Sequence, residues 1–330
     1  LRTLLIFVFF GAMMWFLVRD QVLPSLRTGP GVDVDRRVLI DTWTSHDEWL
    51  VIRLGDREIG SMRTTADQAA DRNSYFVTAH VQLRWAGLQA RVISAARMNR
   101  RLELESFRAR AVLPGVAVKE AKELIAKDLP PGVFEVIGRI TGLVVQLRAR
   151  RGDATNFAEL PLARPATMID SLAPLLRGNV LKKGVVYSQQ VYDPLFGAAA
   201  TNVELIWIED VWEKRDDKPL LLRRMELRMG ERTVNIFVDP DGNVARREIP
   251  LIAKNPGAST PSNDSAPKLV LERLTQAKGR ARFPELLVLP ETVDLENEAL
   301  EGKNSGNVAA GLNLFSLLGS SLTGGSNPGK

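Results

Sequence analysis

The stretch SYFVTAHVQLRW, residues 74–85, decides the fold class. Apolar side chains fill every second position from residue 75 to residue 85, and the positions between them are mainly polar. Successive side chains of a β-strand point to opposite sides of a sheet, so this alternation predicts a strand with one face toward the core. We therefore expect an antiparallel sheet in which residues 74–85 form one strand.

Segments on both sides of this stretch repeat the alternation and are separated by short turn signals. In EWLVIRLGDREIGSMRT, residues 48–64, two apolar-alternating runs meet at Gly55-Asp56, which predicts a hairpin turn and not a site. Gly230-Glu231 predicts a two-residue hairpin connection of type II′. Further strands are predicted at residues 87–95, 101–111, 134–140, 143–150, 185–191, 202–212, 220–229, 232–238 and 244–249.

The fold class expected from this succession is mainly β, a curved antiparallel sheet that forms a half-barrel or a sandwich. One or two helices are expected to pack against it. MIDSLAPLLR, residues 168–177, has Thr167 as N-cap and Gly178 as its stop, and residues 118–128 form an amphipathic segment that ends before two prolines.

The apolar run LLIFVFFGAMMWFLV, residues 4–18, lies between Arg2 and Arg19 and predicts an N-terminal transmembrane helix, an uncleaved signal anchor. A buried core helix is the alternative, but the run is apolar on every face. The arginines that follow it favour the opposite orientation by the positive-inside rule. Long downstream domains translocate largely regardless of charge, so we expect a single-pass protein of the bacterial inner membrane with its domain in the periplasm.

The expected domain organisation follows from changes in composition along the chain. Residues 1–23 form the anchor and residues 24–44 a linker rich in proline and glycine. Residues 45–252 form the extracytoplasmic β domain, and residues 253–330 a second linker with a low-complexity, disordered tail. Within the tail, residues 311–322 carry leucines at helical spacing, which predicts a segment that docks on an envelope protein partner or on lipid.

The composition removes most catalytic chemistry. The chain has no cysteine, and its two histidines, His46 and His80, lie beside no nucleophile motif. We therefore expect a protein that is not an enzyme, with no catalytic residues, no cofactor and no metal site. The net charge is +5, yet 44 basic residues are interleaved with 39 acidic ones, which predicts no nucleic-acid partner. The densest basic tracts, residues 97–101 and 148–151, lie at ends of predicted strands, where flanking charge is commonplace.

Two acidic patterns resemble functional sites, a calcium loop and a catalytic pair of carboxylates, but each has a simple structural explanation. Asp239-Pro240-Asp241-Gly242-Asn243 resembles the start of a calcium loop, but the sixth and twelfth positions hold Val244 and Pro250 instead of glycine and a bidentate acid. The pattern is typical of a tight turn. Glu103 and Glu105 alternate with leucines, which predicts the solvated side of a strand and not a catalytic pair.

Several scattered motifs resemble one group of bacterial envelope proteins. They are Trp49, Val51, Gly55 and Gly60 with their spacing, the helix end LAPLLRG, the G-x-x-Y strand start, and the corner Tyr192-Asp193-Pro194. The chain is similar in these motifs, over residues 45–252, to the LolA/LolB lipoprotein-carrier half-barrels and to the non-catalytic region of membrane-anchored transglutaminase-like proteins. The resemblance implies a half-barrel without the transglutaminase cysteine.

The first functional hypothesis is a membrane-anchored, non-enzymatic binding or scaffold protein of the cell envelope, which holds an apolar or lipid-like ligand or docks a partner. A fixed structural subunit without ligand is the alternative, and a hydrolase that uses serine or carboxylates is a lesser one. A deep apolar pocket favours the carrier and a packed interior favours the scaffold. A cleft where carboxylates and His80 converge favours the enzyme.

Overall fold

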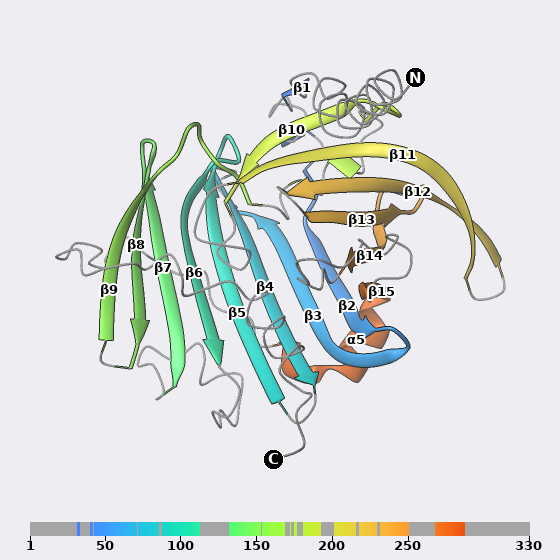
Figure 1. Cartoon of the computed structure of the whole chain (residues 1–330), viewed down its shortest axis with the longest axis horizontal. Coiled ribbons are helices and arrows are strands. Elements are labelled where there is room, and N and C mark those ends of the chain that lie inside the picture. Colours follow the sequence, from blue (N-terminus) through green and yellow to red (C-terminus); the bar gives the residue numbers. More distant parts are fainter. Residues whose placement is uncertain are drawn as a thin grey trace, which may run out of the picture.

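A computed structural model describes residues 32–33, 40–41, 43–70, 72–85, 88–112, 132–152, 154–168, 172, 175–176, 181–192, 201–215, 218–229, 232–250 and 268–287. These residues form one large curved sheet of fifteen strands with few helices (Figure 1). The expectation of a mainly β protein with a curved antiparallel sheet is confirmed. The spatial order is β1-β10-β11-β12-β13-β14-β15-β2-β3-β4-β5-β6-β7-β8-β9.

Most strands pair with the next strand along the chain, so the sheet is largely an antiparallel meander. The first run comprises β2 (His46–Leu54), β3 (Arg57–Gln68), β4 (Ser74–Trp85), β5 (Leu88–Asn99), β6 (Leu104–Val112), β7 (Val133–Thr141), β8 (Val144–Arg151) and β9 (Ala154–Pro161). The second run comprises β10 (Val186–Val191), β11 (Thr201–Arg215), β12 (Lys218–Met229), β13 (Arg232–Val238) and β14 (Val244–Pro250). At the edge, β1 (Val32–Asp33) adds a short parallel pair to β10.

The predicted hairpins join these strands in the expected register. Gly55-Asp56 links β2 to β3, with Leu54 opposite Arg57, and Gly55 has φ +58°, a conformation that glycine adopts without steric cost. Met229 lies opposite Arg232, which is the register of a two-residue connection at 230–231. β4 has the bounds that the alternation in residues 74–85 predicts.

The last described strand lies at the centre of the sheet. β15 (Lys268–Leu274) pairs with β14 on one side and with β2 on the other, so it joins the two runs. Leu271 is opposite Ile52 and is buried with it. The prediction of a linker and tail from residue 253 onward is therefore wrong for residues 268–287. The reason is that KLVLERL does alternate, but only over seven residues beside a stretch rich in Pro, Ser and Asn.

The edge strand β9 was also not predicted. Its sequence ATNFAELP contains one aromatic and one leucine among small and polar residues, and much of it is exposed. An edge strand on one flank of a sheet needs few buried side chains, so its alternation is weak. Pro161 ends the strand, where a missing N–H is tolerated.

The sheet curves so that its two runs face each other. Figure 1 shows β11, β12 and β13 running across the view, at a steep angle to the near-vertical β3 to β9. The main hydrophobic core takes residues from both runs, for example Val77 and Phe107 from the first and Leu205 and Met225 from the second. The concave face is therefore the buried face of both runs.

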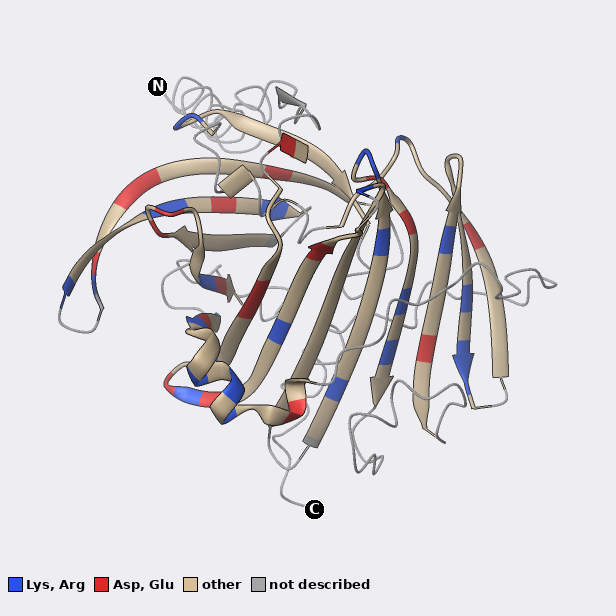
Figure 2. Cartoon of the chain, turned by 180° about the vertical axis from the view of Figure 1, so that it is seen from behind, with Lys and Arg blue, Asp and Glu red and all other residues tan. Residues whose placement is uncertain are grey.

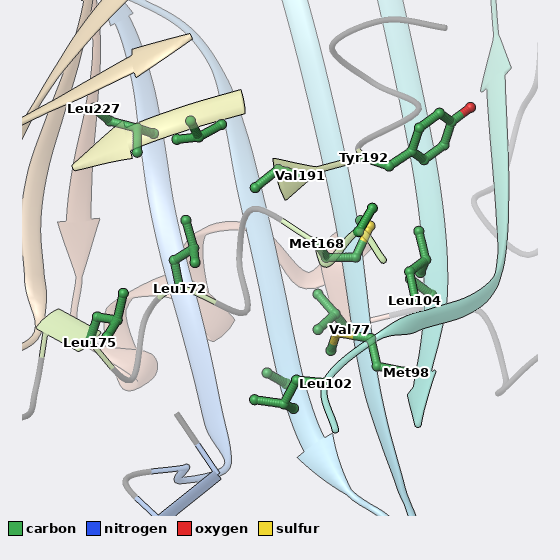
Figure 3. Close-up of a cluster of buried hydrophobic side chains, with 14 of the residues drawn as sticks. Val77, Met98, Leu102, Leu104, Met168, Leu172, Leu175, Val191, Tyr192 and Leu227 are labelled. Carbon is green, nitrogen blue, oxygen red and sulfur yellow. The ribbon is translucent and has the colours of Figure 1, made fainter. Parts of the chain in front are cut away.

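Described residues of the segment between β9 and β10 pack into the main core on this concave face. Among them, Met168, Leu172 and Leu175 lie between Leu227 of the second run and the strands that carry Val77 (Figure 3). All of them are buried, and Leu175 is helical. The interior in this region is packed with the protein's own side chains. Thr167, the predicted N-cap, is buried, forms an isolated β-bridge with Val191 and donates its hydroxyl to Met98 Sδ. The predicted stop Gly178 and most of residues 168–177 lie outside the described residues, as does the helix predicted at 118–128.

The outer, convex face carries the only described α-helix longer than one turn, α5 (Gln276–Arg282), followed by η4 (Pro284–Leu287). The Thr275 side chain accepts a hydrogen bond from the Lys278 N–H and caps α5. Gly279 lies so close to the buried Trp49 that a Cβ there would be 2.5 Å from the indole Cγ. Trp49, Val51, Phe283 and Leu286 form a small apolar cluster that holds this helix on β2.

The predicted anchor, residues 1–23, and the predicted docking segment, residues 311–322, lie outside the described residues. Among the helices that are described, none has the length and hydrophobicity needed to cross a membrane.

Candidate functional site

The Asp239 pattern takes its expected structural role, whereas Glu103 lies outside the strand that was predicted to carry it. The Asp239 carboxylate accepts hydrogen bonds from the backbone N–H of Asn243 at 2.8 Å and from its side-chain amide at 3.3 Å, and Gly242 has φ +81°. The prediction of a tight turn is confirmed at this β13–β14 connection. Glu103 lies in the turn before β6, where it accepts a hydrogen bond from Asn99. In the described part of the chain, no group of three His, Cys, Asp or Glu side chains could hold a metal ion.

His80 is completely buried on the outer side of β4, between Arg63 of β3 and Ile93 of β5 in the sheet register. This is the side of the sheet on which α5 and η4 pack.

The outer face beside α5 carries a set of arginines that the sequence interpretation missed. Residues directly opposite each other in an antiparallel pair lie on the same face. Directly opposite residues form one row across the sheet on this face. From β4 to β8 the row is His80, Ile93, Arg110, Glu135 and Arg150. The same register places seven arginines of β5 to β8 on this face, here called the arginine face: Arg91, Arg97, Arg108, Arg110, Arg139, Arg148 and Arg150.

One buried carboxylate lies at the centre of the arginine face. Glu135 is 3% exposed and accepts a hydrogen bond from Arg110 Nε at 2.6 Å. Arg108 Nε lies 3.5 Å and Arg148 Nη2 3.9 Å from the same carboxylate. Arg110 is itself buried, at 5% exposed. Three guanidinium groups therefore share one carboxylate in a site largely removed from water.

The arginine face has an excess of positive charge. Among the described residues of β5 to β9 that lie on it, seven arginines meet three carboxylates, Glu105, Glu135 and Glu159. Figure 2, which views this side of the molecule, shows basic segments on neighbouring strands beyond α5. Unit charges about 6 Å apart repel by roughly 3 kcal/mol at an effective dielectric constant near 20. Carboxylates close to these guanidinium groups, such as Glu135, therefore stabilise the group.

Apolar side chains lie between the arginines. Ile93 and Ile137 are on the same face and are buried, and Val112 and Val133 border it. Long arginine stems cover apolar surface while the guanidinium groups reach outward. The planar guanidinium donates two parallel hydrogen bonds to a carboxylate or phosphate. The chemistry of the face thus suits an anionic ligand that also carries apolar groups.

A second polar cluster fixes the C-terminal elements beside this face. Arg63 donates from Nε and Nη2 to the two carboxylate oxygens of Asp47, at 2.8 and 3.1 Å. Its Nη1 donates to the carbonyl oxygens of Leu286 and Leu287, at 3.2 and 3.3 Å. The guanidinium also lies 4.8 Å from the centre of the Trp49 ring. Arg63 therefore holds the end of η4 on the outer face.

Asp47 makes this cluster sensitive to acid. Burial raises the pKa of Asp47, but hydrogen bonds from Arg63 and Gln276 and the charge of Arg63 outweigh burial, so the pKa lies below its ordinary value of 3.8. The carboxylate therefore contributes stability above pH 3.8, and this contribution is lost as pH falls through the lower pKa of the folded state.

We expect Asp47→Asn to lower the free energy of unfolding by about 1.5–3 kcal/mol at pH 7, the range for hydrogen bonds to charged groups. The difference from the unsubstituted protein should shrink as pH falls below 3.8 and through the lower pKa of Asp47 in the folded state. Urea unfolding at pH 7 and pH 3 measures both. Asp56→Asn, in the exposed β2–β3 turn, is the control and should change stability at neither pH. An equal cost for Asp47→Asn at the two pH values would contradict the ion-pair assignment.

Arg97, Arg148 and Arg150 lie within strands, although the basic tracts 97–101 and 148–151 were interpreted as flanking charge. Arg100 and Arg151 do lie at strand ends and are exposed. The signal that was overlooked is the tripeptide Arg-Ala-Arg, which occurs in strands at 108–110 and 148–150, and also in α5 at 280–282. Arginines two residues apart on a strand point to the same side, so each tripeptide in a strand places a pair on one face.

No family model, curated protein or solved structure matches the chain. The resemblance to half-barrel envelope proteins stays a prediction.

Proposed function

We propose that the protein is a non-enzymatic scaffold of the cell envelope, held at the membrane by its N-terminal apolar segment, whose arginine face binds an acidic polypeptide segment. The observation that carries the proposal is the excess of arginine around the buried Glu135. The membrane anchor and the periplasmic location rest on the sequence of residues 1–23.

The packed concave face supports a scaffold over a carrier of apolar ligands. Met168, Leu172 and Leu175 occupy the space between the two runs of the sheet (Figure 3). A carrier needs an open apolar chamber there, because such ligands are held by burying most of their surface. A structural subunit that binds no ligand stays the alternative to a scaffold that docks a partner.

The burial of the arginines favours a polypeptide over a membrane surface. Arg110 is buried, and the side chains of Arg108 and Arg148 are each 17% exposed. A flat array of lipid headgroups contacts charges that project freely, whereas a single extended chain can lie between rows of side chains. Nucleic acid is disfavoured because single strands bind through aromatic stacking. The described residues of β5 to β8 on this face include no aromatic side chain, and Phe76 of β4 and Phe157 of β9 only flank them.

A binding assay tests this function with fluorescein-labelled deca-glutamate as the probe. The fluorescence anisotropy should report saturable binding at 50 mM NaCl that weakens at least tenfold at 300 mM NaCl, because exposed charges are screened. Arg150→Gln should weaken binding at least fivefold. Arg151→Gln is the matched control, since the neighbouring residue is exposed and lies on the opposite face.

Equal effects of the two substitutions would contradict the assignment of binding to the arginine face. Vesicles of phosphatidylglycerol and a single-stranded DNA oligonucleotide provide the other arms. Preferential binding of either, with the same dependence on Arg150, would replace the acidic polypeptide by that ligand class.

A further inference from the structure

We infer that the protein forms a symmetric dimer in which β11 of one chain pairs antiparallel with β11 of a second copy around Trp212. The inference goes beyond the proposed function and does not involve the arginine face. It concerns the far end of the β11–β12 hairpin, residues 208–215 and 218–222, here called the hairpin arm. Pairing there joins the curved sheets of the two copies edge to edge.

The hairpin arm extends beyond the strands on both sides of it. In the described structure, β10 pairs with β11 over residues 201–206, and one isolated bridge follows at Trp207. On the other side, β13 pairs with β12 from Arg223 onward. Figure 1 shows this end of β11 and β12 reaching past the other strands. Among the described residues, positions 208–215 therefore present a strand edge whose backbone donors and acceptors have no neighbouring strand.

The most exposed large hydrophobic side chain of the described residues lies on the hairpin arm. Trp212 is 69% exposed and lies opposite Leu221 of β12. Asp210, two residues before it, is opposite Arg223, and Arg223 is opposite Val238 of the main core. Trp212 and Leu221 thus continue the concave side of the sheet past the described core. A tryptophan exposed in this way is typical of a protein–protein contact.

The other edge of the hairpin arm, formed by β12, is less suited to pairing. Pro219 has no backbone N–H, so it interrupts any ladder on this strand. On the outer side, Leu222 is buried with Phe237, and Glu213 accepts a hydrogen bond from Arg246 of β14 at 2.9 Å. These contacts hold the arm on the rest of the sheet. The edge of β11 is therefore a fixed strand that a second strand can join.

The charges on β11 select a second copy and one register. Opposite residues of an antiparallel pair share a face, so the two-fold axis between two β11 strands passes through a residue position. An axis at Trp212 places Asp210 of each copy opposite Lys214 of the other, and both side chains are exposed. An axis at position 211 places Glu209 opposite Glu213, and an axis at position 213 places Glu213 opposite its own copy. Like charges directly opposite are destabilising, so the axis at Trp212 is favoured.

The same register covers the apolar side chains of the hairpin arm. Leu221 and Trp212 of one copy are followed by Trp212 and Leu221 of the other, in one row across the concave side. Aromatic cross-strand pairs stabilise a sheet, and the contact removes apolar surface of Trp212 from water. The interface thus combines main-chain hydrogen bonds, ion pairs and one apolar row.

Charge reversal tests the register in the full chain, solubilised in dodecyl maltoside, with sedimentation equilibrium as the measurement. Asp210→Lys brings lysine opposite Lys214, and Lys214→Asp brings aspartate opposite Asp210. Each should raise the dimer dissociation constant about tenfold, because the axis changes two charge pairs at once. The double variant restores opposite charges and should recover the affinity of the unsubstituted chain. Asp241→Lys, in the β13–β14 turn, is the control and should have no effect. A double variant as weak as the single ones would overturn the inference.

Trp212→Ala tests the apolar row. It should raise the dissociation constant about tenfold and leave the thermal unfolding of the dilute monomer unchanged, because Trp212 is exposed in the single chain. Leu143→Ala is the matched control, an apolar residue that is 45% exposed in the β7–β8 turn, and it should change neither quantity. A lower unfolding temperature of the Trp212→Ala monomer would show that the same chain covers the tryptophan, and would contradict the dimer.

Disulfide formation tests the pairing directly, since the chain has no native cysteine. A tagged Val211→Cys chain mixed with an untagged Glu213→Cys chain should cross-link on oxidation, because these positions are opposite in the proposed pair. Val211→Cys alone should not, because its two copies are offset by two residues, too far for a disulfide. A dimer insensitive to Trp212→Ala and to charge reversal would be held elsewhere and would contradict the inference. Binding of phosphatidylglycerol vesicles that depends on Trp212, without the charge-reversal pattern, would assign the hairpin arm to lipid instead.

Discussion

Replacing Glu135 with alanine is expected to lower the free energy of unfolding by about 3–5 kcal/mol. The carboxylate is 3% exposed, and the guanidinium groups of Arg108, Arg110 and Arg148 surround it. Its loss leaves the buried charge of Arg110 without the carboxylate that accepts its hydrogen bond at 2.6 Å. An uncompensated buried charge costs far more than the pair contributes when it is intact.

Glu105→Ala is the matched control for this substitution. Glu105 lies on the same face and pairs with Arg97 at 3.3 Å, but both side chains are more than one-third exposed. Exposed ion pairs contribute about 0–1 kcal/mol, so the control should change stability by less than 1 kcal/mol. Urea unfolding followed by circular dichroism measures both variants. Similar small costs for the two substitutions would show that Glu135 is not the buried centre of the arginine face.

Phe107→Ala is expected to cost about 3–5 kcal/mol, the range for removing a buried aromatic side chain. The Phe107 ring lies on the concave face, is 1% exposed and is 5.1 Å from the centre of the Tyr192 ring. Tyr192 follows β10, so this contact joins the two runs of the sheet. The substitution leaves a cavity where the runs meet, and thermal or urea unfolding should show the loss.

Gly138 provides an internal check on this prediction. It lies opposite Phe107 in the register, and a Cβ at this position would overlap the edge of the ring. Gly138→Ala alone should cost about 1–3 kcal/mol by overpacking. In the Phe107→Ala background the added methyl enters empty space, so the same change should cost little. A double-mutant cycle measures the difference, and additive costs would contradict the packing of the ring over Gly138.

Strands with strong alternation were predictable from the sequence. β4 and β13 have the expected bounds, and the Gly55-Asp56 turn and the Asp239 turn are where their residue types predict them. β9 and β15 were not predicted, for different reasons. β9 is an edge strand with few apolar residues, whereas β15 is a short run whose two neighbours are far away in the sequence. Local periodicity carries no information on such long-range pairing.

The arginine face was predictable only in part. The repeated Arg-Ala-Arg places pairs of arginines on one side of a strand, and that much follows from period two. The alignment of β6 with β8 across β7, which puts both pairs around Glu135, depends on register between strands. The bulge at Arg97 and Met98 shifts that register between β5 and β6. Because such shifts leave no clear mark in sequence, the site emerges only from the fold.

The central claim is that the arginine face binds carboxylates of a polypeptide, and the arginine side chains report this most directly. The measurement is the NMR spectrum of the arginine Nε–Hε groups of the unsubstituted chain, with and without deca-glutamate. We predict that the peptide shifts the signals of Arg139 and Arg150, the latter identified by its loss in Arg150→Gln. The signal of Arg223 should stay unchanged, because Arg223 is on β12, where its guanidinium lies over the ring of Trp207 of β11. Unchanged signals of Arg139 and Arg150 at saturating peptide would contradict the claim.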